Sequence, residues 1–237
     1  MLVRPVRYDL PVTEPTLHFS SSAGRVELES YSEVATLADL VRGVETARLQ
    51  TSLAVSQCAG CGKCCYEPIP VIGTDIPQLA AGMGVQETEV LDRHLVWPES
   101  RPSGEERHEA IRELARGMSM SDEQAAYAYD FNNGEPVILP RAADGACRFL
   151  DVGLCTIYEH RPLACRIYLC AMGDQLSMLQ EGIVHHGTWH LYSRAGWIAE
   201  AHIAANPFLK ALSWETVPIA SFAPLDPGDP EDLFFFF

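Results

Sequence analysis

The placement of the eight cysteines constrains this chain more than any other feature. Four of them fall within one octapeptide near residue 60, and the other four fall between residues 147 and 170. Thiols that only fill an apolar core have no reason to segregate in this way. The pattern therefore predicts two groups of ligands that the fold brings together around one inorganic centre. The predicted metal ligands are Cys58, Cys61, Cys64, Cys65, Cys147, Cys155, Cys165 and Cys170.

The spacing of the first group favours an iron–sulfur cluster. Cys-x2-Cys occurs twice in overlap, from Cys58 through Cys61 to Cys64. Thiolate is a soft ligand that suits iron–sulfur clusters, zinc and Cu(I). Three thiols at this interval resemble the run around a cubane cluster in bacterial ferredoxins. A zinc ribbon normally places its two pairs roughly 15–20 residues apart. The spacing thus predicts a [4Fe-4S] cluster, with zinc as the alternative cofactor.

The sequence leaves the ligand count open. Side chains of adjacent residues in an extended chain point to opposite sides, so Cys64 and Cys65 can share one ion only in a bent turn. They can also serve two neighbouring centres, or one of them can be a redox-active thiol. Eight thiols allow two four-sulfur sites, or one such site with four cysteines to spare.

Charge and hydropathy exclude several classes of protein. The chain has 17 basic and 32 acidic residues, a net charge of -15, which argues against a nucleic-acid binder because a phosphate backbone would be repelled. No stretch approaches the roughly 20 apolar residues of a membrane span. The N-terminal MLVRPVRYDL has no apolar segment of a secretory signal. We therefore expect a cytoplasmic protein in which cysteines bind metal rather than form disulfides.

The fold class that we predict is α+β. A short β element over residues 1–35 precedes a mainly helical cysteine-cluster domain over 36–212, with irregular loops at the ligands and residues 98–134 as an insertion. Residues 213–237 form an acidic tail that ends in four phenylalanines. This tail, or the acidic surface, is a candidate docking element for a partner protein. The alternative is that the tail covers the protein's own core.

Periodicity, caps and turn residues predict the local elements. We expect strands at 16–20 and 25–32, at Ile69–Ile72 and over PVILP at 136–140. We expect helices from Thr36, from Thr74 or Asp75, over Gln86–Leu95, over 105–118, from Ser121 or Asp122, and from Leu163 to Leu169. From Ile183 onward we expect a strand-like segment or loop, followed by a helix over 195–205.

The two cysteine strings together resemble a known family. CAGCGKCC followed by CRFLDVGLCTIYEHRPLACRIY is similar to the CxxCxxCC, or YkgJ-type, proteins, which are described as zinc- or iron-chelating domains. The resemblance covers about residues 55–170 and leaves Cys170 open as a ligand. Some relatives occur in flagellin lysine N-methylases, so cluster-dependent methyl transfer is a further alternative. The chain has no recognisable SAM-binding glycine loop, and a domain alone does not define a reaction.

The resemblance also suggests residues around the centre. Arg161 and Arg166 lie beside cysteines, where guanidinium groups would offset the negative charge of a thiolate-bound cluster. Tyr158 is placed to donate a hydrogen bond to a sulfur. The alternative is that Tyr158 packs in the core and that the arginines bind turn carbonyls.

The remaining candidates favour structural roles. His186 and His190 have the i, i+4 spacing of a zinc pair, but Gly187 and Thr188 argue against a helix there, so a hydrogen-bonded role is favoured. Asp144 and Asp151 flank Cys147 and suit turns better than acid–base chemistry. The leading hypothesis is a metal-binding protein with an iron–sulfur cluster for redox or cluster-dependent chemistry. The alternative is a zinc-stabilised binding module without catalysis.

Overall fold

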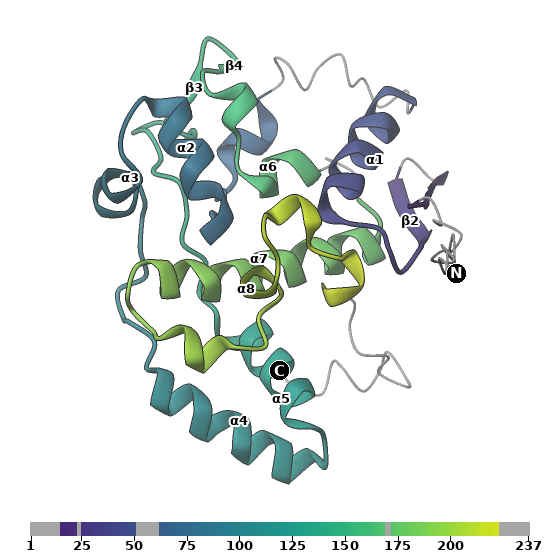
Figure 1. The fold of residues 1–237 in the computed structure, drawn as a ribbon. Helices are drawn as coiled ribbons and strands as arrows, with labels where there is room; N and C mark the ends of the chain where they lie inside the picture. The colour runs from purple at the N-terminus through teal and green to yellow at the C-terminus, as the bar shows by residue number, and fades with distance from the viewer. Residues whose placement is uncertain (1–14, 23–24, 51–61, 169–171, 223–237) are drawn as a thin grey trace, which may run out of the picture.

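The computed structural model describes residues 15–22, 25–50, 62–168 and 172–222. The α+β prediction is confirmed, because a two-stranded sheet near the N-terminus precedes a largely helical body (Figure 1). The helices are α1 (Leu37–Gln50), α2 (Ile76–Met83), α3 (Glu87–Arg93), α4 (Gly104–Met118), α5 (Asp122–Asn133), α6 (Leu163–Ile167), α7 (Asp174–Arg194) and α8 (Pro207–Lys210). Among the described residues, no helix combines the length and the apolar character that a membrane crossing demands.

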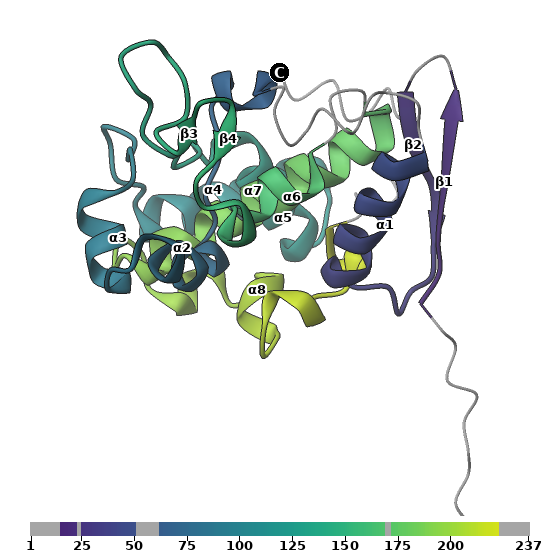
Figure 2. The ribbon, with the colours of Figure 1, turned by 90° about the horizontal axis from the view of Figure 1, so that it is seen from above.

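The N-terminal sheet pairs β1 (Leu17–Ser22) with β2 (Arg25–Tyr31) in antiparallel register. Along β2, Val26 and Leu28 are buried while their neighbours are more exposed, which is the period of two of a half-buried strand. The sheet stands at one end of the molecule beside α1 (Figure 2). The Val26 carbonyl accepts a hydrogen bond from the Gly173 N–H at 2.7 Å, which ties the sheet to the start of α7. The strands predicted at 16–20 and 25–32 are confirmed. The preceding segment RYDLPV, at residues 7–12, also has the composition of a short strand but lies outside the described residues.

Helix α1 follows the period that its sequence predicts. Thr36 and Asp39 close its first turn, because the Thr36 N–H donates to the Asp39 carboxylate at 2.9 Å and the Asp39 N–H donates to the Thr36 hydroxyl at 3.4 Å. The apolar positions that define the period are all buried: Leu37, Leu40, Val41, Val44 and Ala47.

The prediction of a strand or loop after Ile183 is wrong, because helix α7 continues through this segment. It is a single helix of 21 residues that runs through the middle of the molecule (Figures 1 and 2). Gly187 does not break it, because the missing side chain makes room for Ile72: a Cβ on Gly187 would lie 2.3 Å from the Ile72 Cγ2. Residues on several sides of the helix are buried, so no polar stripe marks its period. The predicted helix over 195–205 is also wrong, since that segment forms only a short 3₁₀ turn.

The same helix spans two apolar cores. Its first half, with Leu176 and Ile183, packs into the cluster that contains α1 and the inner face of β2. Its second half, with Trp189 and Tyr192, packs into the cluster beneath α2 and α3. Several cysteines of the second half of the chain lie against this second core. Helix α7 therefore fixes where the cysteine loops can sit.

Two predicted strands are shorter than expected. The segments 69–72 and 136–140 pair only through an isolated bridge between Pro70 and Ile138, and Ile138 also bridges to Val96. Proline has no N–H to donate, so the prolines in these segments stop a longer ladder. The bonds that remain still join the segments, since the Val71 N–H donates to the Val137 carbonyl at 2.8 Å.

Helices α4 and α5 follow each other as a helical pair, on the side of α7 opposite to α6 (Figure 1). Ser103 caps α4 by accepting from the Glu106 N–H at 3.3 Å. Ser121 caps α5 and exchanges two hydrogen bonds with Gln124, so the predicted cap is confirmed. Whether residues 98–134 are an insertion stays a prediction.

The contact between Gly187 and Ile72 gives a test of how α7 is held. Gly187→Ala should destabilise the protein by roughly 1–3 kcal/mol, because the new methyl group overpacks a filled core. In α4, Gly117 has no atom within 4 Å of a built Cβ. Gly117→Ala should therefore stabilise by about 0.5–1 kcal/mol through helix propensity. Urea unfolding followed by circular dichroism measures the free energy of unfolding of both variants. The same change in both would contradict the packing argument.

The partly buried imidazole of His190 predicts an acid dependence of stability. Burial, and then the nearby Arg194 charge, lower the pKa of His190 to about 4. The unfolded chain has the ordinary pKa of about 6.5 and binds this proton first, so stability falls as the pH falls from about 6.5 to about 4. His190→Gln should make the slope in this window shallower by up to about 1.4 kcal/mol per pH unit. An unchanged slope in His190→Gln would contradict this account.

Candidate metal centre

The described part of the first cysteine stretch begins with a tight turn. Gly62 adopts a left-handed conformation with φ 64°, which favours glycine, and a 3₁₀ turn (η2, Lys63–Tyr66) follows. The Cys65 N–H donates to the Gly62 carbonyl at 2.9 Å. This bent backbone brings both Cys64 and Cys65 to one pocket, as only a bent turn can. Cys58 and Cys61 lie outside the described residues.

The second stretch contributes three cysteines from three different elements. Cys147 follows a turn in which the Asp144 carboxylate accepts from the Ala146 N–H at 3.0 Å, so Asp144 has the predicted turn role. Cys155 ends the hairpin of β3 (Leu150–Asp151) and β4 (Leu154–Cys155). Cys165 lies on α6, and Cys170 lies outside the described residues.

The backbone joins the two stretches directly. The Cys147 N–H donates to the Cys65 carbonyl at 2.6 Å. The Arg141 guanidinium donates to the Tyr66 carbonyl and, at 2.7 Å, to the Gly145 carbonyl. The bonds to the Cys65 and Tyr66 carbonyls connect residues that are far apart in the sequence, so the loops that carry the thiols hold each other in place.

All five described cysteines line one pocket of about 60 Å³. This exceeds the roughly 10–15 Å³ that a single water molecule requires. Apolar side chains form much of the remaining wall: Ile69, Leu139, Phe149, Leu150 and Ile157. The convergence of the two cysteine groups is thus seen for Cys64, Cys65, Cys147, Cys155 and Cys165. A set of soft sulfur donors in an apolar pocket suits zinc or an iron–sulfur cluster.

The five described thiols do not by themselves form a complete coordination sphere for one metal ion. Within the described ranges, no three Cys, His, Asp or Glu side chains lie close enough together to hold one metal ion. The predicted ligand set also includes Cys58, Cys61 and Cys170, on which the described residues give no information. Cys147 and Cys155 are not in disulfides.

Burial favours the protonated form of two thiols in the pocket. It raises the pKa of Cys147 and, more strongly, that of Cys165. The negative charges of neighbouring thiolates act in the same direction, and the Arg161 charge opposes them at Cys165. A bound cation would replace these protons, because a metal ligand must be the thiolate.

Asp75 positions the helix that carries Cys165, and its role there was not predicted. Its fully buried carboxylate accepts from the Leu163 N–H at the start of α6 at 2.8 Å, from the Ile72 N–H at 3.0 Å and from the Gln78 amide at 3.0 Å. Burial raises its pKa to about 6 despite these donors. The sequence suggested only a cap for α2, since nothing in it links residue 75 to residue 163.

Of the three residues predicted around the centre, two line the pocket and one does not. Tyr158 and Arg161 line the pocket, with the Arg161 guanidinium 3.6 Å from the centre of the Tyr158 ring. Arg161 Nε donates to the Tyr158 carbonyl at 2.8 Å. Arg166 is not among the lining residues, and its guanidinium donates to the carbonyls of Arg161 and Glu159 and to the Gln78 side chain. Arg166 thus holds the turn before Cys165.

The hairpin at the pocket exposes apolar side chains. Val152 is 94% exposed and has φ 47°, a left-handed conformation that a β-branched residue rarely adopts. Gly153 follows with φ 79°, so the two residues form the tight turn that joins β3 to β4. Leu154 and Tyr158 are also exposed. The rim of the cysteine pocket is therefore partly apolar.

Among the described residues, His186 and His190 are not part of a group of three side chains that could hold a metal ion. His186 and His190 do lie one turn apart on α7, contrary to the expectation of a broken helix. The His186 ring packs against Tyr127 with 5.1 Å between centroids, and the His190 ring stacks on Phe208 at 5.8 Å.

A family model matches residues 57–183, more than half of the chain. The chain belongs to the CxxCxxCC family. The family is described as a zinc- or iron-chelating domain, so the match supports metal binding by this protein without deciding between the two metals. The matched range includes every cysteine of both groups. The comparisons with curated proteins and with solved structures gave no match.

Asp75→Asn tests how the centre of this CxxCxxCC protein is positioned. An asparagine nitrogen would face an N–H donor where a carboxylate oxygen now accepts, so we expect a loss of about 1–3 kcal/mol of stability. Chemical unfolding at neutral pH measures it. Asp144→Asn is the control, because an asparagine oxygen can still accept the single bond to Ala146. Equal free energies of unfolding for both variants would show that Asp75 does not position α6 in this way.

Proposed function

We propose that this protein carries an iron–sulfur cluster, held by cysteines of both groups, for redox or cluster-dependent chemistry. The single observation that carries the proposal is the pocket lined by Cys64, Cys65, Cys147, Cys155 and Cys165. The family to which the chain belongs is described as a zinc- or iron-chelating domain, which supports metal binding here. The step from a metal to a cluster is our proposal.

The number and order of the thiols support a cluster over a single zinc ion. A structural zinc site is closed by four ligands, whereas five described thiols share this pocket and Cys58 and Cys61 precede them at the spacing of a cluster-binding run. A bound cluster would supply one-electron chemistry. The chain's own residues would hold it, keep water away through the apolar wall and offset its negative charge through Arg161.

Zinc remains the second candidate because of one feature of the rim. The exposed Val152 and Leu154 lie on the hairpin that supplies Gly153 and Cys155 to the pocket, and with the exposed Tyr158 they would suit contact with another protein. In this case the metal would stabilise a binding module without catalysis. Because thiols need a reducing environment to stay available for either metal, we propose a cytoplasmic location.

Anaerobic purification distinguishes the two candidates. A cluster protein should be brown, contain iron and sulfide, and bleach on reduction with dithionite. A colourless protein with one equivalent of zinc would refute the cluster and support the binding module. Elemental analysis and ultraviolet–visible spectra give both answers from one preparation.

Single substitutions then test the ligands. Cys155→Ala and Cys165→Ala should each lower the bound metal severalfold, because each removes a thiolate donor. Leu154→Ala changes the exposed neighbour of Cys155 on the same strand and should keep the metal. Near-stoichiometric metal in both cysteine variants would contradict their assignment as ligands.

A further inference from the structure

A second pocket lies away from the cysteines, between α5, α7 and α8. It has a volume of about 200 Å³, and none of its lining residues is a cysteine. In Figure 1 the helices α4 and α5 lie on the side of α7 opposite to the β3–β4 hairpin and α6. Since a water molecule takes about 30 Å³ of liquid volume, this pocket suits a molecule with the size of a small amino acid.

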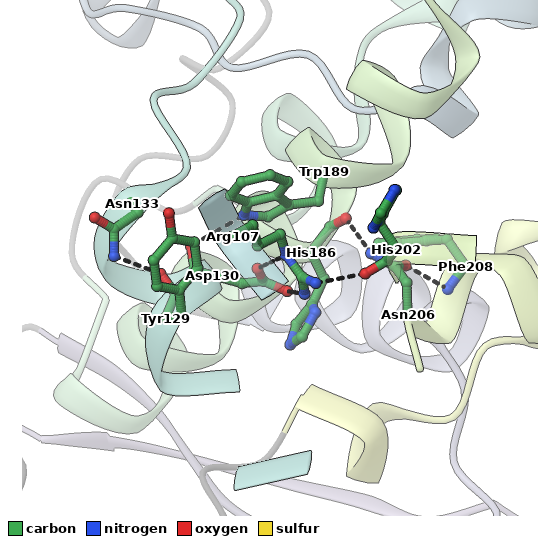
Figure 3. A network of polar contacts seen from close by, with 9 residues as sticks. All are labelled: Arg107, Tyr129, Asp130, Asn133, His186, Trp189, His202, Asn206 and Phe208. Carbon is green, nitrogen blue, oxygen red and sulfur yellow. Dashed lines mark hydrogen bonds and ion pairs between the residues drawn. The ribbon is translucent and has the colours of Figure 1, made fainter. Parts of the chain in front are cut away.

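A buried ion pair forms the inner wall of this pocket. Arg107 and Asp130 are 5% and 4% exposed, and two hydrogen bonds of 2.7 Å join the guanidinium to the carboxylate (Figure 3). A third Arg107 donor binds the His202 carbonyl. The guanidinium also lies 5.1 Å from the centre of the Trp189 ring. Arg107 has five N–H donors, so two stay available to a ligand.

His186 adds a neutral donor to the same wall. The residue is 8% exposed and lines the pocket, while its Nδ1 is buried without a hydrogen-bond partner. An unpaired buried acceptor is less costly here than an unpaired buried N–H, so the proton belongs on Nε2. Burial, followed by the nearby His185 and Arg107, lowers the pKa of His186 to about 4, which keeps the ring neutral at physiological pH.

The rim of the pocket carries one charge of each sign. Lys210 ends α8 and Glu123 lies in the first turn of α5, and both are exposed lining residues. In the described part of the chain no ion pair joins them. Arg107 and Asp130 compensate each other inside, so the lining has no net charge but offers both a cationic and an anionic side chain at its rim. A simple anion or cation would meet one favourable and one unfavourable charge.

We propose that this pocket binds a small zwitterion of the amino-acid class, with its carboxylate toward Lys210, Arg107 and His186 and its ammonium group toward Glu123. The buried pair of Arg107 and Asp130 preorganises the wall, because neither side chain needs to be ordered on binding. The site uses no residue of the cysteine centre. The proposal therefore goes beyond the proposed cluster function and is tested independently of it.

Titration calorimetry on the full-length protein with its metal bound tests the proposal. The probes are the twenty common amino acids, with acetate and methylammonium as molecules that carry only one of the two charges. We expect saturable binding of at least one small amino acid, and much weaker binding of acetate and methylammonium. Binding of acetate as tight as that of the best amino acid would overturn the zwitterion, and no binding of any amino acid would overturn the site.

Two rim variants locate the binding. Lys210→Gln and Glu123→Gln should each weaken the affinity about five- to tenfold, as expected for the loss of one charge-assisted contact at a partly exposed position. Glu113→Gln, at an exposed position of α4 outside the pocket, is the matched control. Unchanged affinity in both rim variants would overturn the location. The metal content of all three variants should stay at the wild-type level, which separates this test from that of the cysteine centre.

Discussion

The centre depends on the contact between two stretches of chain that are remote in the sequence. They meet where the Cys147 N–H donates to the Cys65 carbonyl, and Arg141 ties the same loops through two further carbonyls. At the five described thiols, neither stretch has a regular element longer than a few residues. Hydrogen bonds between the loops therefore replace the ladder of a sheet or helix in setting where the sulfurs lie.

A buried carboxylate extends this arrangement to the third cysteine of the second group. Asp75 accepts the Leu163 N–H and thereby joins the start of α2 to the start of α6, the helix of Cys165. An isolated buried carboxylate is costly, and it persists here because its oxygens accept three hydrogen bonds. Arg166 holds the turn before the same helix through carbonyls. The side chains of Asp75 and Arg166 thus hold the backbone around the helix of Cys165.

Helix α7 lies between the cysteine pockets and the second pocket. Its neighbouring residues His185 and His186 line different pockets, the first beside Cys64 and Cys165 and the second beside Arg107. A buried helix with polar residues on more than one side is unusual, and each side is matched here by a different environment. The CxxCxxCC match ends within this helix, at residue 183, whereas the second pocket uses residues on both sides of that limit.

The sequence by itself determined the grouping of the cysteines, the α+β class, the N-terminal strands and the helices with clear caps such as Ser121. These features depend on local spacing and propensity. It did not determine α7, because Gly187 is tolerated only through its close contact with Ile72. Nor did it link Asp75 to Leu163 or Arg107 to Asp130, since the partners of buried polar groups are chosen by packing between distant segments. Tertiary structure alone decided which thiols share a pocket, because only the folded chain brings those loops together.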